Sequence, residues 1–291
     1  MEKCLILYSN GLDSRLVVKI MQEKGFEPIA IYFKLPFSPN LEKESKEFCE
    51  KNKCKFILAD CTKSPLLEEY LHLIDHPKFN RGTSFNPCID CKAFLLKKAK
   101  EFADKNKINL IVTGEVLGER PMSQTLNAMR TIEKEAGVVG RIFRPLSAKL
   151  LPEIEGTNKN EFYEISGRSR KTQMELAEHF KIDYPTPGGG CKLCEPQLKA
   201  RLKLTIKNNM LNQDNYLMAQ IGKHYVIDKN WFVVARNEKE SLIIEKMKNS
   251  IESDLGVPAI YFYNKDTKEK ALEIQKAYKE KNSDLYKEFK I

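Results

Sequence analysis

The stretch Lys3-Cys-Leu-Ile-Leu-Tyr8, followed by Ser9-Asn10-Gly11-Leu12-Asp13-Ser14, decides the fold of this chain. The first part is a short apolar run typical of a buried strand, and a helix with an apolar face follows the second part. A loop between a strand and a helix presents backbone N–H groups and the positive end of the helix dipole to an anion. Small residues let phosphates approach the backbone closely, and Asp13 suits a magnesium ion. The segment therefore predicts a phosphate-binding loop.

Strands and helices continue to alternate after this unit. We expect strands at 28–33, 55–60 and 108–113, and helices at 41–52, 91–105 and 122–136. Alternation of this kind predicts an α/β fold with a doubly wound, mostly parallel sheet. Further on, we expect a helix at 172–180, a Pro/Gly break at 184–190, a helix starting at Glu195-Pro196, a hairpin at 225–235 turning at Lys229-Asn230, and a small α+β C-terminal region. The predicted parts are 1–165, 166–205 and 206–291, with a boundary near residue 205.

Composition narrows the class of protein. Hydrophobic residues make up 42% and charged residues 31% of the 291 residues, which excludes a disordered chain. No apolar run approaches the roughly 18 residues of a membrane helix. We therefore expect a cytoplasmic protein with no membrane association. The net charge of +9 suggests a polyanionic partner, and a solvated lysine-rich surface without a partner explains the charge equally well.

Two Cys-x-x-Cys pairs stand out among the eight cysteines, in Asn86-Pro-Cys88-Ile-Asp-Cys91-Lys92 and in Gly188-Gly-Gly-Cys191-Lys-Leu-Cys194. Each pair is expected to open a helix, whose N-terminus stabilises a thiolate. The spacing leaves three hypotheses open: a zinc site, a catalytic pair that carries a persulfide, and an iron–sulfur cluster. The remaining cysteines lack such spacing and are interpreted as structural: Cys4, Cys49, Cys54 and Cys61.

The first loop resembles the phosphate loop of the ATP pyrophosphatase (PP-loop) superfamily, whose usual form is Ser-Gly-Gly-x-Asp-Ser. Asn10 replaces a glycine, and Asn is the other residue that best tolerates a positive φ. The Asn-Pro-Cys-x-x-Cys-Lys segment is similar to the catalytic segment of tRNA-uridine 2-sulfurtransferases. Thr113-Gly114 resembles their Thr-Gly-His segment, with Glu115 where His is common. The resemblance covers residues 1 to about 205.

This resemblance implies an adenine nucleotide alpha hydrolase-like fold and an enzyme that uses ATP and Mg²⁺ to thiolate a uridine of tRNA. It implies catalytic roles for Cys91, Cys191 and Asp13. With the additional Cys88, the first pair and the distant Cys191 resemble the cluster ligands of the iron–sulfur-dependent tRNA thiolases. This resemblance implies a [4Fe-4S] cluster on Cys88, Cys91 and Cys191, with zinc less favoured. Cys194 is a candidate fourth ligand that we expect to be dispensable. The implied nucleotide-binding residues are Ser9, Asn10, Gly11, Asp13, Ser14, Phe33, Thr113 and Gly114.

Basic residues are the remaining candidates. Arg168, Arg170 and Lys171 form a cluster suited to a tRNA backbone. The expected partners are tRNA and a sulfur donor, either inorganic sulfide or a persulfide carrier, and a homodimer is left open. Two alternatives stay open: a sulfur-inserting enzyme for a small molecule or cofactor precursor, and a zinc-stabilised RNA-binding protein with a degenerate loop. Candidate phosphate-binding cations are Arg120, Arg141, Arg144 and Lys149, and two C-terminal segments match no known module: Gly222-Lys-His224 and Val234-Ala-Arg-Asn237.

Overall fold

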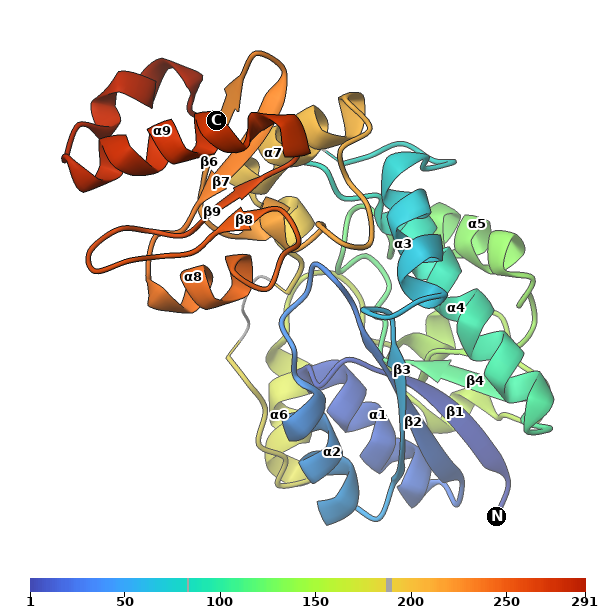
Figure 1. Cartoon of the computed structure of the whole chain (residues 1–291). Helices are drawn as coiled ribbons and strands as arrows, with labels where there is room; N and C mark the ends of the chain where they lie inside the picture. The colour runs from blue at the N-terminus through green and yellow to red at the C-terminus, as the bar shows by residue number, and fades with distance from the viewer. Residues whose placement is uncertain (83, 187–189) are drawn as a thin grey trace. The chain divides into compact units, whose positions relative to one another are not determined.

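The structure, a computed structural model, describes residues 1–82, 84–186 and 190–291 (Figure 1). It divides into two compact units, Met1–Cys191 (unit 1) and Lys192–Ile291 (unit 2). The expected boundary near residue 205 lies inside α7 (Pro196–Lys207), a helix of unit 2. Residues 187–189, part of the predicted Pro/Gly break, lie outside the described residues.

A parallel sheet forms the centre of unit 1. Its strand order in the described residues is β3-β2-β1-β4-β5, and each neighbouring pair runs parallel. The chain moves from β1 outward to β3 and then returns to the other side of β1 with β4. The carboxyl ends of β1 and β4 therefore lie at a topological switch point, where α/β sheets bind their ligands. The strands are β1 Lys3–Tyr8, β2 Glu27–Lys34, β3 Lys55–Asp60, β4 Leu110–Thr113 and β5 Ile142–Phe143.

Helices cover both faces of this sheet. Figure 1 shows α1, α2 and α6 on one face and α3, α4 and α5 on the other. The apolar stripe of α1, including Leu16, Val17, Ile20 and Met21, is fully buried against the strands. The helices are α1 Leu12–Glu23, α2 Glu42–Lys51, α3 Leu66–Asp75, α4 Cys88–Lys105, α5 Leu126–Ala136 and α6 Lys171–His179, and 3₁₀ turns lie at Pro145–Leu150 and Lys159–Glu161.

This arrangement confirms the predicted doubly wound α/β fold. Two details differ from expectation. Helix α5 begins at Leu126 rather than near residue 122, because Thr125 caps it by accepting a hydrogen bond from the Ala128 N–H, 3.2 Å away. Helix α3 was not predicted. Among the described helices, none combines the length and apolar character needed to cross a membrane.

Unit 2 is a small α+β unit, as expected. Its described strands form an antiparallel sheet in the order β6-β7-β9-β8. The predicted hairpin is present, but it turns at Asp228-Lys229, one residue early, because these two residues take positive φ values of 50° and 61°. The elements are α7, β6 Lys223–Ile227, β7 Asn230–Val234, α8 Glu238–Ile244, β8 Ser250–Ile251, β9 Ile260–Phe262 and α9 Lys268–Lys279, with 3₁₀ turns at Lys192–Cys194, Met218–Gln220, Lys265–Thr267 and Ser283–Phe289.

Candidate active site

The loop between β1 and α1 has the conformation that its sequence predicted. Asn10 takes a φ of 65°, so asparagine fills the left-handed position that glycine usually takes. Its side-chain Oδ1 accepts hydrogen bonds from the Tyr8 hydroxyl at 3.0 Å and from Arg15 Nη2 at 2.8 Å. Ser14 Oγ donates to the Gly11 carbonyl at 3.0 Å. The loop is thus held by its own side chains, while the first-turn N–H groups of α1 lack partners within the helix.

Asp13 is the electrostatic centre of this loop. Its Oδ1 is buried and has no hydrogen-bond partner. Burial and, to a lesser extent, the negative charge of Glu119 raise the pKa of Asp13 from 3.8 to about 6, although the charges of Arg170 and Arg120 oppose the rise. Glu119 Oε2 and Arg170 Nε are likewise buried without partners. Unsatisfied polar atoms around one loop mark a site built for a ligand.

This environment fits a magnesium ion. Two neighbouring carboxylates with buried, unpartnered oxygens repel each other, and a divalent cation relieves that repulsion. Carboxylate oxygens are the protein ligands that Mg²⁺ prefers. Asp13 and Glu119 are therefore the residues that would hold the ion beside bound phosphates.

The segment after β4 contacts the loop directly. A Cβ atom added to Gly114 would lie 2.7 Å from the carbonyl carbon of Asp13 and 2.9 Å from the Ser14 nitrogen, so only glycine fits there. Thr113 Oγ1 donates to Glu115 Oε2 at 3.1 Å. The strand register pairs Tyr8 with Tyr32, which places Phe33 level with Ser9 at the same sheet edge.

Glu115, whose role the sequence left in doubt, anchors a buried ion-pair network. Its carboxylate contacts Lys92 Nζ at 3.3 Å and Arg144 Nε at 3.1 Å, and Arg144 also contacts Glu133 at 2.5 Å. Burial opposes the ionisation of Glu115, but the charges of Lys92 and Arg144 outweigh it and lower its pKa to about 2. The network joins α4 to the segment beside the phosphate loop.

The first cysteine pair opens α4 as predicted. Cys88 and Cys91 lie one helical turn apart, so they share a face. Asn86 Nδ2 lies 3.0 Å from Cys88 Sγ, and the Tyr70 hydroxyl of α3 lies 3.5 Å from Cys91 Sγ. Burial raises the pKa of Cys91, although the Tyr70 contact and the charge of Lys92 partly offset it. At Cys91, burial thus outweighs the expected stabilisation of a thiolate by the helix N-terminus.

The second pair differs from expectation. Cys191 precedes a short 3₁₀ turn, Lys192–Cys194, whose last residue is Cys194, and α7 begins only at Pro196, because a proline at the first helical position starts the helix there. The expected helix start at Cys191 was therefore wrong. Cys191 lies near enough to Tyr70 to raise the pKa of its hydroxyl, after the larger effects of burial and Cys91. This relation places Cys191 in the neighbourhood of the first pair.

The donor set suits an iron–sulfur cluster in its chemistry, since soft thiolates are the usual ligands. Within the described ranges, no three His, Cys, Asp or Glu side chains converge on a point as the ligands of a single metal ion do. Each cysteine ligand of a cubane cluster binds its own iron. The thiols that hold a cluster are therefore spaced around it and are not all within bonding distance of one metal ion. The four other cysteines are buried, as predicted for structural thiols: Cys4, Cys49, Cys54 and Cys61.

The candidate phosphate-binding cations separate into two groups. Arg144 is buried in the Glu115 network, and Arg141 contacts Asp104 at 2.7 Å and the Ile108 carbonyl at 2.9 Å. Carboxylates and carbonyls engage both guanidinium groups, although Arg144 Nη2 is buried without a partner among the described residues, and the expected phosphate role of both residues stays a prediction. Arg120, in contrast, lies near enough to Asp13 for its charge to lower the pKa of that carboxyl group, as the charge of Arg170 does. Lys149 is exposed.

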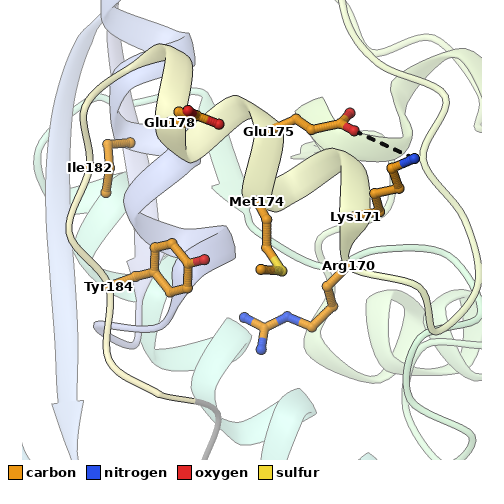
Figure 2. Close-up of a pocket in the computed structure, with 7 residues that line it drawn as sticks. All are labelled: Arg170, Lys171, Met174, Glu175, Glu178, Ile182 and Tyr184. Carbon is orange, nitrogen blue, oxygen red and sulfur yellow. Dashed lines mark ion pairs between the residues drawn. The ribbon is translucent and has the colours of Figure 1, made fainter.

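Arg170 also lines a groove of about 560 Å³ along α6 (Figure 2). Figure 2 shows Arg170, Met174 and Tyr184 gathered on one side of the helix, with Lys171 paired to Glu175. Arg168 and the side chain of Lys171 are exposed. Of the predicted basic cluster, Arg170 thus acts on the phosphate loop and lines the groove, and Lys171 lines the groove.

Sequence reasoning missed several site residues. Glu119 faces Asp13, Tyr70 contacts Cys91, and Lys92 pairs with Glu115. Lys92 immediately follows the cysteine pair, which is the one local signal for its position. The other two depend on contacts between segments far apart in the chain.

Comparison with known proteins agrees with this geometry. A profile of the family described as "Thiamine biosynthesis protein (ThiI)" matches residues 1–183, more than half of the chain. The chain belongs to the ThiI family. This membership confirms the predicted resemblance to PP-loop tRNA sulfurtransferases, and the match spans the phosphate loop and the first cysteine pair.

Two similar proteins are named "Probable tRNA sulfurtransferase". The protein of Methanocaldococcus jannaschii is 25% identical over 210 residues, which cover 70% of this chain and 50% of the relative. That of Methanosarcina mazei is 27% identical over 188 residues, covering 62% and 44%. The chain thus spans about half the length of these relatives. A solved 4-thiouridine synthetase–RNA complex with bound ATP is 18% identical, with a TM-score of 0.41, covering 71% of this chain and 51% of that one.

Proposed function

We propose that this protein is an ATP-dependent tRNA uridine thiolase. ATP activates a uracil carbonyl as an adenylate, and sulfur then replaces the carbonyl oxygen. The relatives' names and the family support this assignment. The sequence-based alternatives, a thiolase of small molecules and a zinc-stabilised RNA-binding protein, become outcomes of the test below.

One observation carries the proposal: the phosphate loop and the thiols are linked by direct contacts. Gly114 abuts Asp13, the neighbouring Glu115 pairs with Lys92, and Lys92 follows Cys91 on α4. An adenylation site and a sulfur-delivery site must serve the same carbon atom. Their connection through a buried ion-pair network fixes one relative to the other.

The phosphate loop would act on ATP. The free N–H groups of the first α1 turn, with Ser9 and Ser14, bind phosphate oxygens. Asp13 and Glu119 hold Mg²⁺, and Arg120 and Arg170 offset the negative charge that builds when the uracil oxygen attacks the α-phosphate and pyrophosphate leaves. A hydrosulfide then attacks the activated carbon and AMP departs with the former carbonyl oxygen, so ATP, uridine and sulfide yield AMP, pyrophosphate and thiouridine.

We assign Cys88, Cys91 and Cys191 as ligands of a [4Fe-4S] cluster. Three cysteine ligands would leave one iron of such a cluster available to sulfide. Inorganic sulfide would supply it directly, whereas a persulfide carrier would supply it only together with a thiol that reduces the outer sulfur by two electrons. The half-buried position of Cys191 and the exposed position of Cys194 support Cys191 as the ligand and Cys194 as dispensable.

We assign Arg168, Arg170 and Lys171 to the tRNA backbone. Their removal would flatten the salt dependence of tRNA affinity by about 0.7–0.9 in log–log slope for each lost phosphate contact. Replacement of Lys276, an exposed residue of α9 in unit 2, supplies a control with the same loss of charge.

The test combines ATP turnover with nucleoside analysis. We expect the anaerobically purified chain to convert ATP to AMP and pyrophosphate only with tRNA, and Asp13→Ala or Ser14→Ala to lose this activity by about 10²–10³-fold. Thiouridine in the product tRNA should follow AMP formation. Full pyrophosphate release by Asp13→Ala refutes the role of the loop. Turnover on a small molecule without tRNA binding favours the small-molecule alternative, and tRNA binding without AMP formation favours the RNA-binding one.

A further inference from the structure

A second site lies in unit 2, built by the two segments that sequence analysis left without a role. A cavity of about 120 Å³ is lined by Lys192, Arg201 and Arg236, with Glu195 and Gln220 among its other polar residues. Its size is ample for several waters or one small tetrahedral anion, since a single water needs only about 10–15 Å³. Cations from three separate segments thus face one polar cavity.

Arg201 is the half-buried cation of this cavity. Its guanidinium donates hydrogen bonds to the backbone carbonyls of Ala219 and Gly222, both at 3.4 Å, and its Nε is buried without a partner among the described residues. Within the residues that the structure describes, Glu240 and Glu195 attract the charge of Arg201, but neither forms a close ion pair with it. An anion bound in the cavity would supply the close partner that this half-buried positive charge lacks.

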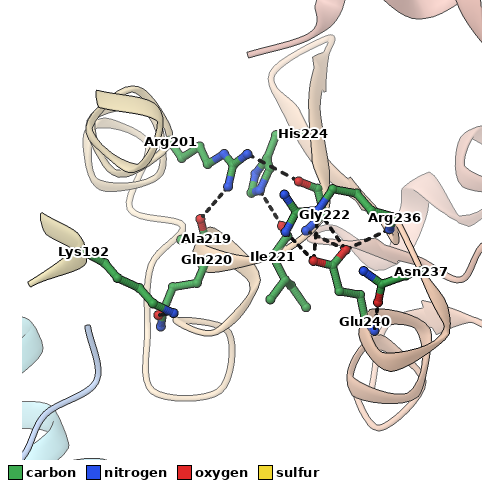
Figure 3. Close-up of polar contacts among 10 residues, drawn as sticks. All are labelled: Lys192, Arg201, Ala219, Gln220, Ile221, Gly222, His224, Arg236, Asn237 and Glu240. Atoms are coloured by element: carbon green, nitrogen blue, oxygen red, sulfur yellow. Dashed lines mark hydrogen bonds and ion pairs between the residues drawn. The ribbon is translucent and has the colours of Figure 1, made fainter. Parts of the chain in front are cut away.

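Arg236 faces the same region with a fixed orientation (Figure 3). Glu240 holds its Nε at 3.0 Å, and also accepts hydrogen bonds from the backbone N–H groups of Arg236 at 2.8 Å and Gly222 at 3.2 Å. Asn237 caps α8 at Glu240. The carboxylate of Glu240 is therefore engaged at close range by Arg236 and the two N–H groups, and it attracts Arg201 only from farther away.

His224 shows the same excess of positive charge. Burial and, to a lesser extent, the charges of Arg201 and Arg236 lower the pKa of His224 to about 3, although the hydrogen bond to Ile221 and the charge of Glu240 oppose this. Its Nε2 contacts the Ile221 carbonyl at 2.8 Å, and its Nδ1 accepts a hydrogen bond from Trp231 Nε1 at 3.0 Å. This neutral ring links the cavity to the only tryptophan of the chain.

We propose that the cavity bounded by Lys192, Arg201 and Arg236 binds a phosphate group of an RNA backbone. The α7 residues that line the cavity, Gln197, Leu198 and Arg201, share one face of the helix, whereas the exposed Lys203 and Lys207 lie on another face. The net charge of +9 suits a phosphate that belongs to a polyanion. The choice of RNA as the source rests on the proposed function; the anion site does not.

Trp231 provides the readout for the full-length chain. Inorganic phosphate should produce a saturable change in Trp231 fluorescence, and a tRNA transcript should compete for the same site. We expect Arg201→Gln to weaken phosphate binding about tenfold or more, and to reduce the salt slope of tRNA affinity by about 0.7–0.9. Lys192→Gln should show a smaller loss, and it decides the case if Arg201→Gln does not fold, because Lys192 contacts a neutral side chain, Gln220. Lys276→Gln on α9 is the matched control and should leave both unchanged.

The outcomes separate this proposal from the proposed function. Phosphate and tRNA affinities that are the same in Arg201→Gln, Lys192→Gln and Lys276→Gln overturn the anion site. Phosphate binding that tRNA does not displace overturns RNA as its source. AMP formation at saturating tRNA reports on the loop in unit 1 and should stay near the wild-type rate in Arg201→Gln, so a failure of thiolation in the wild type contradicts only the proposed function.

Discussion

Asp13→Asn should make the protein more stable while it abolishes ATP turnover. Burial and the charge of Glu119 raise the pKa of Asp13 from 3.8 to about 6. Between these two pH values the folded state keeps a proton that the unfolded chain has released, so the free energy of unfolding falls as pH rises through this window. At about 1.4 kcal/mol per pH unit, the ionised Asp13 costs about 3 kcal/mol of stability above pH 6.

An uncharged asparagine avoids this cost, although its buried amide offsets part of the gain. We therefore expect an increase of roughly 2 kcal/mol at pH 8, or about 4–8 °C in the melting temperature of a unit of this size. The measurement is thermal unfolding in the presence of a chelator at pH 4 and at pH 8. At pH 4 the two proteins should differ little, because wild-type Asp13 is then largely protonated in the fold.

The exposed Asp183 offers a matched control, since Asp183→Asn removes one carboxylate from the same unit without a buried partner. It should show no comparable gain. Added Mg²⁺ should stabilise the wild type more than Asp13→Asn. A stability difference that does not vary with pH, or an Asp13→Asn protein less stable than wild type at pH 8, would refute the electrostatic account of the loop.

Other predictions address the surroundings of this loop. Glu115→Gln leaves Arg144 buried without a full countercharge and should lower the free energy of unfolding, measured in urea, by about 3–5 kcal/mol. Because the pKa of Glu115 is lowered to about 2, its stabilising effect in the wild type should persist at neutral pH and decline only as pH falls below 4.5. Gly114→Ala forces its new methyl group against Asp13 and should lower the rate of AMP formation by about 10²-fold, measured at saturating ATP; an unchanged rate would contradict the close packing. Cys194→Ala should keep the iron absorbance and thiolation, and loss of both would reverse the ligand assignment. Alanine variants expected to lose both are those at Cys88, Cys91 and Cys191.

The parts of the fold that sequence predicted are those encoded by local patterns. The apolar run of β1, the small residues of the loop and the apolar stripe of α1 are adjacent in the chain. The run is typical of a buried strand, and the stripe has the period of a helix. The tolerance of Asn10 for positive φ is also a property of a single residue, and the structure confirms it. The cap of α5 at Thr125 lies within a polar stretch, which explains why its start was placed too early.

The site was less accessible to sequence reasoning because its contacts are long-range. Arg144 looked like a free cation near a short strand, yet it is buried against Glu115, 29 residues away. Glu119 lies 106 residues after Asp13 in the sequence, and only the fold brings their charges together. The start of α7 was predicted from Pro196, but the same sequence gave no indication that Cys191 precedes a 3₁₀ turn instead of a helix. Charge and residue type identify candidates, whereas burial decides which of them remain available.

The most direct test of the proposed activity measures both products of the reaction, AMP and thiouridine, in the same sample. The purified chain is incubated anaerobically with ATP, Mg²⁺, sulfide and unmodified tRNA, and the AMP and thiouridine formed are quantified by chromatography and mass spectrometry. We predict equal amounts of AMP and thiouridine, and neither product with Asp13→Asn. Formation of ADP instead of AMP, or AMP without thiouridine in tRNA, would contradict the account.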